Sequence, residues 1–217
     1  MQQLTTIQTL AVAVIPVLFA ITLHEVAHGW VARWFGDRTA EMLGRLTINP
    51  LKHIDPIGTV LVPAILILMP TPYVFGWAKP VPVSMRNLRD PRRHMMIVAA
   101  AGPVSNMLMA LFWALVAKLA IIGGLEGAPG VFVLAMTEWG ILINILLAVF
   151  NLLPIPPLDG GRVLSGLLPG RYAAKFDSVE PYGMIVVLVL LFTGMLWPVL
   201  RPAMLLINRG ITGLVGL

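Results

Sequence analysis

The chain contains no cysteine and few charged residues. The absence of cysteine excludes disulfide bonds and thiolate metal sites, so histidine and carboxylate side chains remain as candidate metal ligands. Only 12% of the 217 residues are charged and 58% are hydrophobic, whereas soluble domains carry about 25% charged residues. This composition predicts an integral membrane protein that forms a single domain over residues 1–217.

The chain also lacks the features of a nucleic-acid-binding protein and of a cleaved leader peptide. Its formal net charge is +5, but no groove of interleaved basic and aromatic residues is evident, so nucleic acid is not an expected partner. Arginines beside apolar runs are instead expected at the headgroups of the lipid bilayer. No basic segment or clear cleavage site precedes the first apolar run, which we interpret as an uncleaved anchor in a prokaryotic inner membrane.

Apolar segments dominate the chain and predict an all-α polytopic membrane protein. Four of them are about as long as the 20 residues that a bilayer requires, and they cover residues 7–34, 95–122, 133–153 and 182–200. Residues 57–75 are ambiguous, because the apolar part ends at Pro70 and is short, which predicts a re-entrant segment within residues 40–80. Residues 202–217 predict a C-terminal helix that is either interfacial or a further span.

The distribution of basic residues predicts the topology. Arginine and lysine are concentrated in the loops before residue 95 and after residue 160, while residues 123–130 contain none. The positive-inside rule therefore places these basic loops in the cytoplasm and the N-terminus outside. Basic residues lie on both sides of residues 57–69, and they can share the cytoplasmic side only if residues 57–69 enter the membrane and return.

The most informative motif is His24-Glu25-Val26-Ala27-His28, which lies in the inner half of the first predicted span. Residues four apart share a helix face, so His24 and His28 can bind one metal ion. Glu25 lies beside them and can activate water for hydrolysis. Ionisable residues inside a membrane are costly and usually mark a functional site.

A catalytic zinc usually has three protein ligands, so a third is needed. Asp159 is the best candidate, because it follows the third predicted span at the cytoplasmic side, level with the C-terminal half of the HEVAH helix. Pro154, Pro156 and Pro157 should interrupt the helix before it. His53 is expected at the surface and Asn144 in helix packing.

Three ordered motifs resemble those of the site-2 proteases, the intramembrane zinc metalloproteases, and specifically the small subgroup without PDZ or CBS domains. They are Leu23-HEVAH-Gly29, Ala101-Gly-Pro-Val-Ser-Asn106 and Asn151-Leu-Leu-Pro-Ile-Pro-Pro-Leu-Asp-Gly-Gly-Arg162. Residues 49–53 (Asn-Pro-Leu-Lys-His) and 76–83 (Gly-Trp-Ala-Lys-Pro-Val-Pro-Val) also resemble this subgroup. The polar region after the catalytic span resembles the family's membrane-re-entrant β-loop.

This resemblance implies one Zn²⁺ per chain, held by His24, His28 and Asp159, with Glu25 as general base. It implies that transmembrane proteins are the substrates and that Asn151 and Pro156 hold an unwound substrate segment near the metal. Asn106 is a further candidate for substrate binding, although it can equally orient a metal ligand or form an interhelical hydrogen bond. The oligomeric state is left open.

Two other function classes fit parts of the pattern. A metal transporter would use the same three ligands as a transit site, but Glu25 and the single, asymmetric site disfavour it. A non-catalytic membrane scaffold on the same fold would be expected to lose the acid or a ligand, and this chain retains all four residues. Intramembrane proteolysis on the cytoplasmic side is therefore the leading hypothesis.

Overall fold

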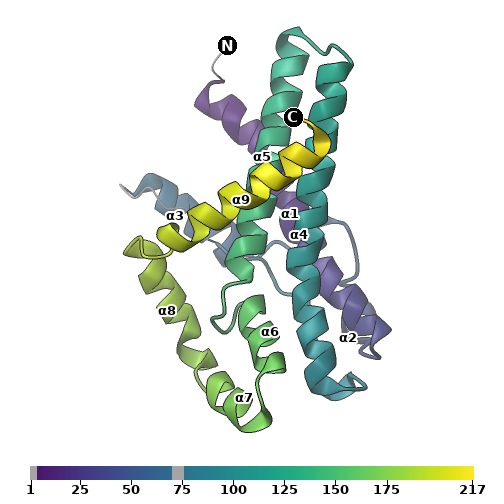
Figure 1. Ribbon diagram of the computed structural model, residues 1–217, viewed down its shortest axis with the longest axis vertical. Coiled ribbons are helices and arrows are strands. Elements are labelled where there is room, and N and C mark those ends of the chain that lie inside the picture. Colours follow the sequence, from purple (N-terminus) through teal and green to yellow (C-terminus); the bar gives the residue numbers. More distant parts are fainter. Residues whose placement is uncertain (1–3, 70–75) are drawn as a thin grey trace.

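The computed structural model describes residues 4–69 and 76–217. These residues form helices joined by turns and loops, and no β-strand occurs among them (Figure 1). The prediction of an all-α fold is thereby confirmed. The β-loop suggested by the family resemblance is not formed as strands within the described part of the chain.

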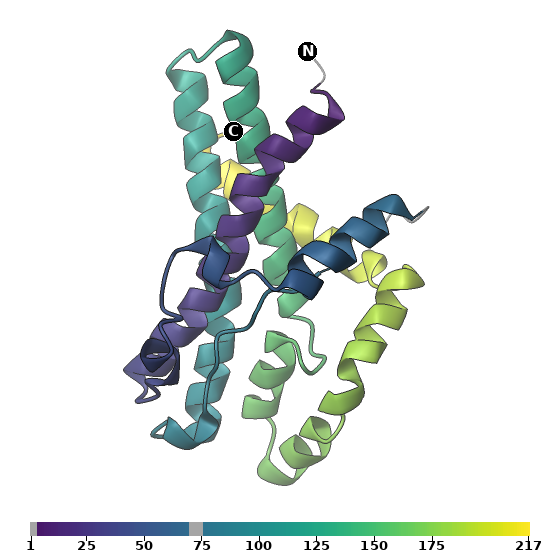
Figure 2. The ribbon, with the colours of Figure 1, turned by 180° about the vertical axis from the view of Figure 1, so that it is seen from behind.

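Three helices form the central bundle: α1 (Thr6–Trp34), α4 (Pro91–Ile122) and α5 (Gly127–Asn151). Within the described residues, these are the three single helices that are long and apolar enough to cross a membrane. All three pack against one another, and Figures 1 and 2 show α4 and α5 as an antiparallel pair with α1 crossing them. The first three predicted spans are confirmed, although α5 begins before the predicted residue 133.

The helix starts have local causes in the sequence. Thr5 and Gln8 form a capping box at α1, with the Gln8 amide donating to Thr5 Oγ1 at 3.3 Å and the Thr5 amide donating to Gln8 Oε1 at 2.8 Å. Asp90 caps α4 by accepting the Arg93 amide at 3.2 Å, and Pro91 occupies the first helical position.

The fourth predicted span, residues 182–200, is not a single straight helix. Helix α8 (Glu180–Phe192) is followed by a break and then by α9 (Trp197–Val215), and the two axes differ by 82°. Gly194 lies in the break with φ +76°, a left-handed conformation that ends a helix. The predicted C-terminal helix is part of α9, which crosses α5 (Figure 1).

The segment between α1 and α4 contains only short elements: α2 (Thr39–Met42), η1 (Pro50–Lys52), the π-helical η2 (Pro56–Leu61), α3 (Val62–Leu68) and η3 (Met85–Asn87). The part of the predicted re-entrant segment at residues 70–75 lies outside the described residues. The two sides of that segment meet, because the Trp77 amide donates to the Gly58 carbonyl at 3.0 Å and the Lys79 amide donates to the His53 carbonyl at 2.9 Å. A chain that enters and returns on the same side has this arrangement.

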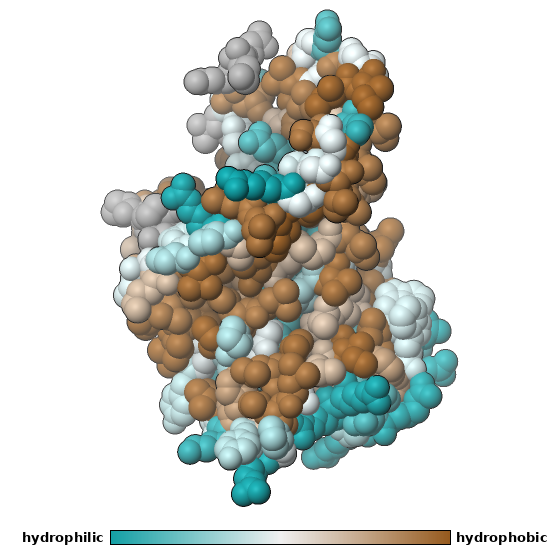
Figure 3. All heavy atoms as spheres, in the orientation of Figure 1, coloured by the Kyte–Doolittle hydropathy of each residue, from teal (hydrophilic) through white to brown (hydrophobic). Residues whose placement is uncertain are grey.

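Two helices after α5, α6 (Asp159–Leu167) and α7 (Gly170–Asp177), lie at the same end of the molecule as the start of α4 (Figure 1). Polar residues gather at this end, while apolar residues cover the middle of the face seen in Figure 3. The main core is built from α4, α5, α8 and α9, around Ala110, Ile145, Val187 and Leu200. Together with the three long helices, this surface makes the chain an integral membrane protein.

Candidate metal centre and active site

His24 and His28 lie one turn apart on α1 and face the same point. Their Nε2 atoms are 3.1 Å apart. Asp159, the first residue of α6, places its Oδ2 atom 3.2 Å from His24 Nε2 and 3.4 Å from His28 Nε2. The structure therefore brings together the three residues that the sequence predicted as ligands, although Asp159 lies 131 and 135 positions from the two histidines.

The outer nitrogen of each histidine ring is hydrogen-bonded to an oxygen atom. His24 Nδ1 lies 2.6 Å from Asn106 Oδ1, and His28 Nδ1 lies 2.7 Å from the Val98 carbonyl. Because both partners are acceptors, each Nδ1 carries the hydrogen, and each Nε2 presents a lone pair to the common point. Metal-binding histidines are commonly fixed in this way by a hydrogen bond from the other ring nitrogen.

The donor set fits a divalent cation. Asp159 Oδ2 is buried and has no hydrogen-bond partner among the described residues. Two imidazole lone pairs and one carboxylate oxygen thus converge without a hydrogen between them, and a bound cation would remove their mutual repulsion. Two nitrogens and one oxygen match the protein ligand set of hydrolytic zinc sites.

The close approach of α4 to α1 at this point depends on a glycine. A Cβ atom at Gly102 would lie 2.5 Å from His28 Nε2 and 2.6 Å from His24 Cε1. Since side chains essentially never approach this closely, any larger residue here would push the imidazole rings out of place. The glycine of the Gly102-Pro103-Val104-Ser105-Asn106 motif is therefore a steric requirement of the centre.

Asn106 is fully buried at the interface of the three long helices. Besides its contact with His24, its Nδ2 donates to the Ala20 carbonyl at 3.2 Å and to Asn144 Oδ1 at 2.8 Å. Asn144 is also fully buried and donates to the Gly140 carbonyl at 2.8 Å. This geometry favours the role of orienting His24 over contact with substrate, and Asn144 is more than a packing residue.

Glu25 is half-buried and lies outside the three-ligand group. Its Oε2 atom accepts the Val81 amide at 2.7 Å. Val81 belongs to residues 76–84, an irregular segment that we call the strap, which runs toward the start of α4 (Figure 2). The sequence singled out this segment only through its family resemblance.

The two proposed substrate-binding residues of the Asn151–Arg162 motif lie at the end of α5. Asn151 is partly buried and its Nδ2 donates to the Leu147 carbonyl at 3.0 Å, one turn back in its own helix. Pro156 is buried, and the Pro156–Pro157 peptide bond is cis. A role of either residue in binding substrate remains a prediction.

In the α1–α4 connection, the prediction for His53 was wrong and Asp37 was overlooked. His53 is 2% exposed rather than at the surface, and its Nε2 lies 2.9 Å from the Thr47 carbonyl. Asp37 is buried and accepts hydrogen bonds from the Ser84 amide at 2.7 Å and from Asn87 Nδ2 at 3.0 Å. Burial acts to raise the pKa of Asp37, but hydrogen bonds from Thr39, Asn87 and Ser84 outweigh it and lower the pKa. Nothing in a single sequence distinguishes these two from ordinary loop residues.

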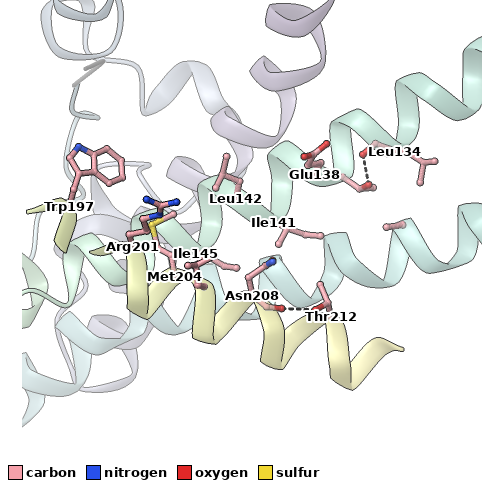
Figure 4. Close-up of a pocket in the computed structure, with 13 residues that line it drawn as sticks. Leu134, Glu138, Ile141, Leu142, Ile145, Trp197, Arg201, Met204, Asn208 and Thr212 are labelled. Atoms are coloured by element: carbon pink, nitrogen blue, oxygen red, sulfur yellow. Dashed lines mark hydrogen bonds between the residues drawn. The ribbon is translucent and has the colours of Figure 1, made fainter. Parts of the chain in front are cut away.

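A separate cavity lies away from this centre. A cavity of about 750 Å³ lies between α5 and α9, where Glu138 and Arg201 project among apolar residues (Figure 4). None of the residues that line it is one of His24, Glu25, His28 and Asp159. The candidate active site is therefore defined by the ligand geometry and not by cavity size.

Comparisons with known proteins agree with the centre. A family profile described as peptidase family M50 matches residues 126–194. YwhC of Bacillus subtilis, whose name provisionally describes a zinc metalloprotease, is 44% identical over 202 residues, which are 87% of this chain and 85% of that protein. Rip2 of Mycolicibacterium smegmatis, with the same description, is 30% identical across 81% of this chain and 64% of its own length.

A more distant relative, zinc metalloprotease MJ0392 of Methanocaldococcus jannaschii, is 24% identical across 86% of this chain and 43% of its own length. No solved structure matches the chain. The identity to YwhC extends over most of both proteins. The chain therefore belongs to peptidase family M50, the site-2 proteases, and is a zinc metalloendopeptidase.

Proposed function

We propose that this chain is an intramembrane endopeptidase that hydrolyses peptide bonds within or near the transmembrane segments of other membrane proteins. The observation that carries this proposal is the convergence of His24, His28 and Asp159 beside Glu25, on a helix that is apolar and long enough to cross a bilayer. Hydrolytic groups in such a helix are suited to substrates that are themselves in the membrane.

His24, His28 and Asp159 would hold one Zn²⁺ per chain. When bound, zinc supplies Lewis acidity for the attacking water and for the scissile carbonyl. Asn106 and the Val98 carbonyl hold the two imidazole rings, and Gly102 leaves the space that they need. These contacts set the positions of the two imidazole donor atoms.

Glu25 acts as the general base. Its carboxylate takes a proton from the attacking water and then returns that proton to the leaving amine. Losing this carboxylate removes turnover and leaves the three metal donors in place, because Glu25 is not one of them. Losing Asp159 removes both a donor atom and turnover.

The substrate helix must unwind before cleavage, because its carbonyl groups are held in its own hydrogen bonds. Asn151, at the end of α5, and Pro156, in the turn before Asp159, would contact the unwound segment. Residues that weaken a substrate helix should therefore promote cleavage, and an all-leucine span should resist it.

The active site would face the cytoplasmic side of a prokaryotic cell membrane. The charged residues at the start of α4 lie at the same end of the molecule as α6 and α7 (Figure 1). The positive-inside rule assigns that end to the cytoplasm. His24 and His28 lie in the half of α1 nearer to it.

The test is cleavage of a panel of single-span membrane proteins by the purified chain in detergent, with bound zinc measured in parallel. Wild type should cut within the span, whereas Glu25→Gln should bind zinc and cut nothing. Glu126→Gln, which changes an exposed acid in the α4–α5 loop, is the matched control and should cut like wild type. Equal cleavage by Glu25→Gln would contradict the mechanism, and zinc-free wild type would favour a scaffold. Zinc binding with no cleavage by wild type would contradict the substrate class and favour a metal transporter.

A further inference from the structure

The carboxylate of Glu25 has one hydrogen-bond donor in the described part of the chain, and that donor is a backbone amide. Val81 N–H donates to Glu25 Oε2 at 2.7 Å. Hydrogen bonds to a carboxylate are shorter and stronger than those between neutral groups. One oxygen of the side chain is therefore held, and Oε1 has no such partner among the described residues.

The residues around Val81 make its amide a dedicated donor. Pro80 and Pro82 flank it, and proline has no backbone N–H. Proline also fixes its own φ angle and restricts the residue before it, so the local backbone has few alternative conformations. Across these three residues, Val81 alone can donate a backbone hydrogen bond to Glu25.

The strap is fastened on both sides of Val81. On one side, the Lys79 amide donates to the His53 carbonyl at 2.9 Å and Arg45 Nη2 donates to the Lys79 carbonyl at 2.7 Å. On the other side, the Ser84 amide donates to Asp37 Oδ2 at 2.7 Å. A segment tied at both ends is a fixed wall of the site, whereas a lid would need a free end or a hinge.

The strap also packs directly on α1. Val81 is 7% exposed, and a Cβ atom at Gly29, one turn beyond Glu25, would lie 2.9 Å from Val81 Cγ1. The glycine after His28 therefore lets the strap approach the helix closely enough for the amide to reach Glu25. The strap and α1 are therefore in close contact at the position of the Val81–Glu25 hydrogen bond.

We propose that the Val81 amide is a positioning group for hydrolysis: it holds Glu25 Oε2 and thereby directs Oε1 toward the attacking water. This inference rests on the proposed role of Glu25 as general base. It predicts that removal of one backbone hydrogen atom, with every side chain of the metal centre intact, slows the chemical step. Small displacements of a catalytic group can reduce the rate by about 100-fold.

The experiment replaces Val81 by proline, which removes the amide hydrogen and keeps a side chain of similar size. Val83→Pro is the matched control, because Val83 lies two residues further along the strap and its amide has no partner among the described residues. Val81→Ala keeps the amide and removes only side-chain packing. For each variant we would measure kcat, KM and bound zinc with a single-span substrate that wild type cuts.

The expected result for Val81→Pro is a kcat about 10–100-fold lower, with KM and zinc content unchanged. Val83→Pro stays near wild type, and Val81→Ala, which keeps the amide, loses less kcat than Val81→Pro. Unchanged kcat in Val81→Pro, alongside inactive Glu25→Gln, would overturn this inference alone. A higher kcat in Val81→Pro would also overturn it, since the strap would then be an inhibitory lid. An active Glu25→Gln would instead overturn the proposed general base.

Misfolding of the proline variant would show as lost zinc, and an amide-to-ester replacement at Val81 then decides the question. The ester keeps the valine side chain and the chain direction but has no N–H to donate. A lower kcat with unchanged KM and zinc in the ester variant supports the inference, and wild-type kcat overturns it.

Discussion

The two sides of the active site are built in different ways. On the metal side, three side chains converge from α1 and α6, and their positions are set by other side chains and carbonyls inside a three-helix bundle. On the side of the proposed general base, which we call the general-base side, Glu25 is held by the backbone of the strap. The strap is itself secured by Asp37 and Arg45 from the α1–α4 connection.

This difference explains which parts of the site are easy to recognise. Metal ligation requires particular residue types at fixed spacing, so its residues are visible in a sequence. A backbone amide is available from every residue except proline, so a backbone donor such as Val81 cannot be recognised from its residue type in the sequence. Substitutions on the metal side should reduce zinc binding, whereas substitutions on the general-base side should leave zinc binding unchanged.

The largest effect is expected from closing the space between α1 and α4. Gly102→Ala would place a Cβ atom 2.5 Å from His28 Nε2, and we expect loss of both zinc and activity. Gly213→Ala in α9, where a Cβ atom would meet nothing within 4 Å, is the matched control and should retain both. Zinc content by mass spectrometry checks this. A zinc content in Gly102→Ala equal to that of wild type would show that the imidazole rings can move to accommodate the added Cβ atom.

A smaller effect is expected from the hydrogen bonds behind His24. Asn106→Leu removes the acceptor of His24 Nδ1 and should weaken zinc binding about 10–100-fold, as is usual for groups that support metal ligands. Asn144→Leu should have a weaker effect, because Asn144 acts only through Asn106. Competition with a chelator measures both affinities, with Asn208→Leu in α9 as control. Equal affinities in all four proteins would contradict the role of this network.

The smallest effect is expected from Asp37, on the general-base side. Its pKa is lowered in the folded chain because hydrogen bonds to the carboxylate outweigh burial. A lowered pKa stabilises the fold above the unfolded pKa of about 4, and this contribution is lost as the pH falls through the folded value. Asp37→Asn should therefore cost about 1–3 kcal/mol of stability near neutral pH and less in acid. Zinc content should not change.

Thermal unfolding of wild type and Asp37→Asn at several pH values measures this contribution. The difference in Tm between the two proteins should shrink as the pH is lowered below about 4. A constant difference at all pH values would mean that the Asp37 carboxylate is not charged in its hydrogen-bonded cluster.

Much of the fold and of the metal centre could be predicted from the sequence. Apolar length gave α1, α4 and α5, and the HEVAH spacing with the Asp159 motif gave a group that the structure brings together. The break between α8 and α9 was missed, because Gly194 in an apolar run does not by itself indicate a bend of 82°. Asn106 could not be distinguished between substrate contact and ligand support, since that depends on which helix faces it.

The strap could not have been predicted as a structural element. Main-chain atoms of residues 77–84 pair with the side chains of Asp37 and Arg45 and with the carbonyls of His53 and Gly58. Such long-range pairing leaves no periodicity in either segment. His53 was predicted at the surface because a polar residue in a loop is usually exposed.

The most direct test of the central claim is X-ray absorption at the zinc edge on the purified chain. We expect two imidazole ligands and additional oxygen ligands at about 2.0–2.2 Å, with no sulfur. Asp159→Asn should lose zinc or change the oxygen shell, while Glu25→Gln should give the wild-type spectrum. A spectrum with three or more imidazoles, or one that changes in Glu25→Gln but not in Asp159→Asn, would contradict the assignment of His24, His28 and Asp159 as the metal centre.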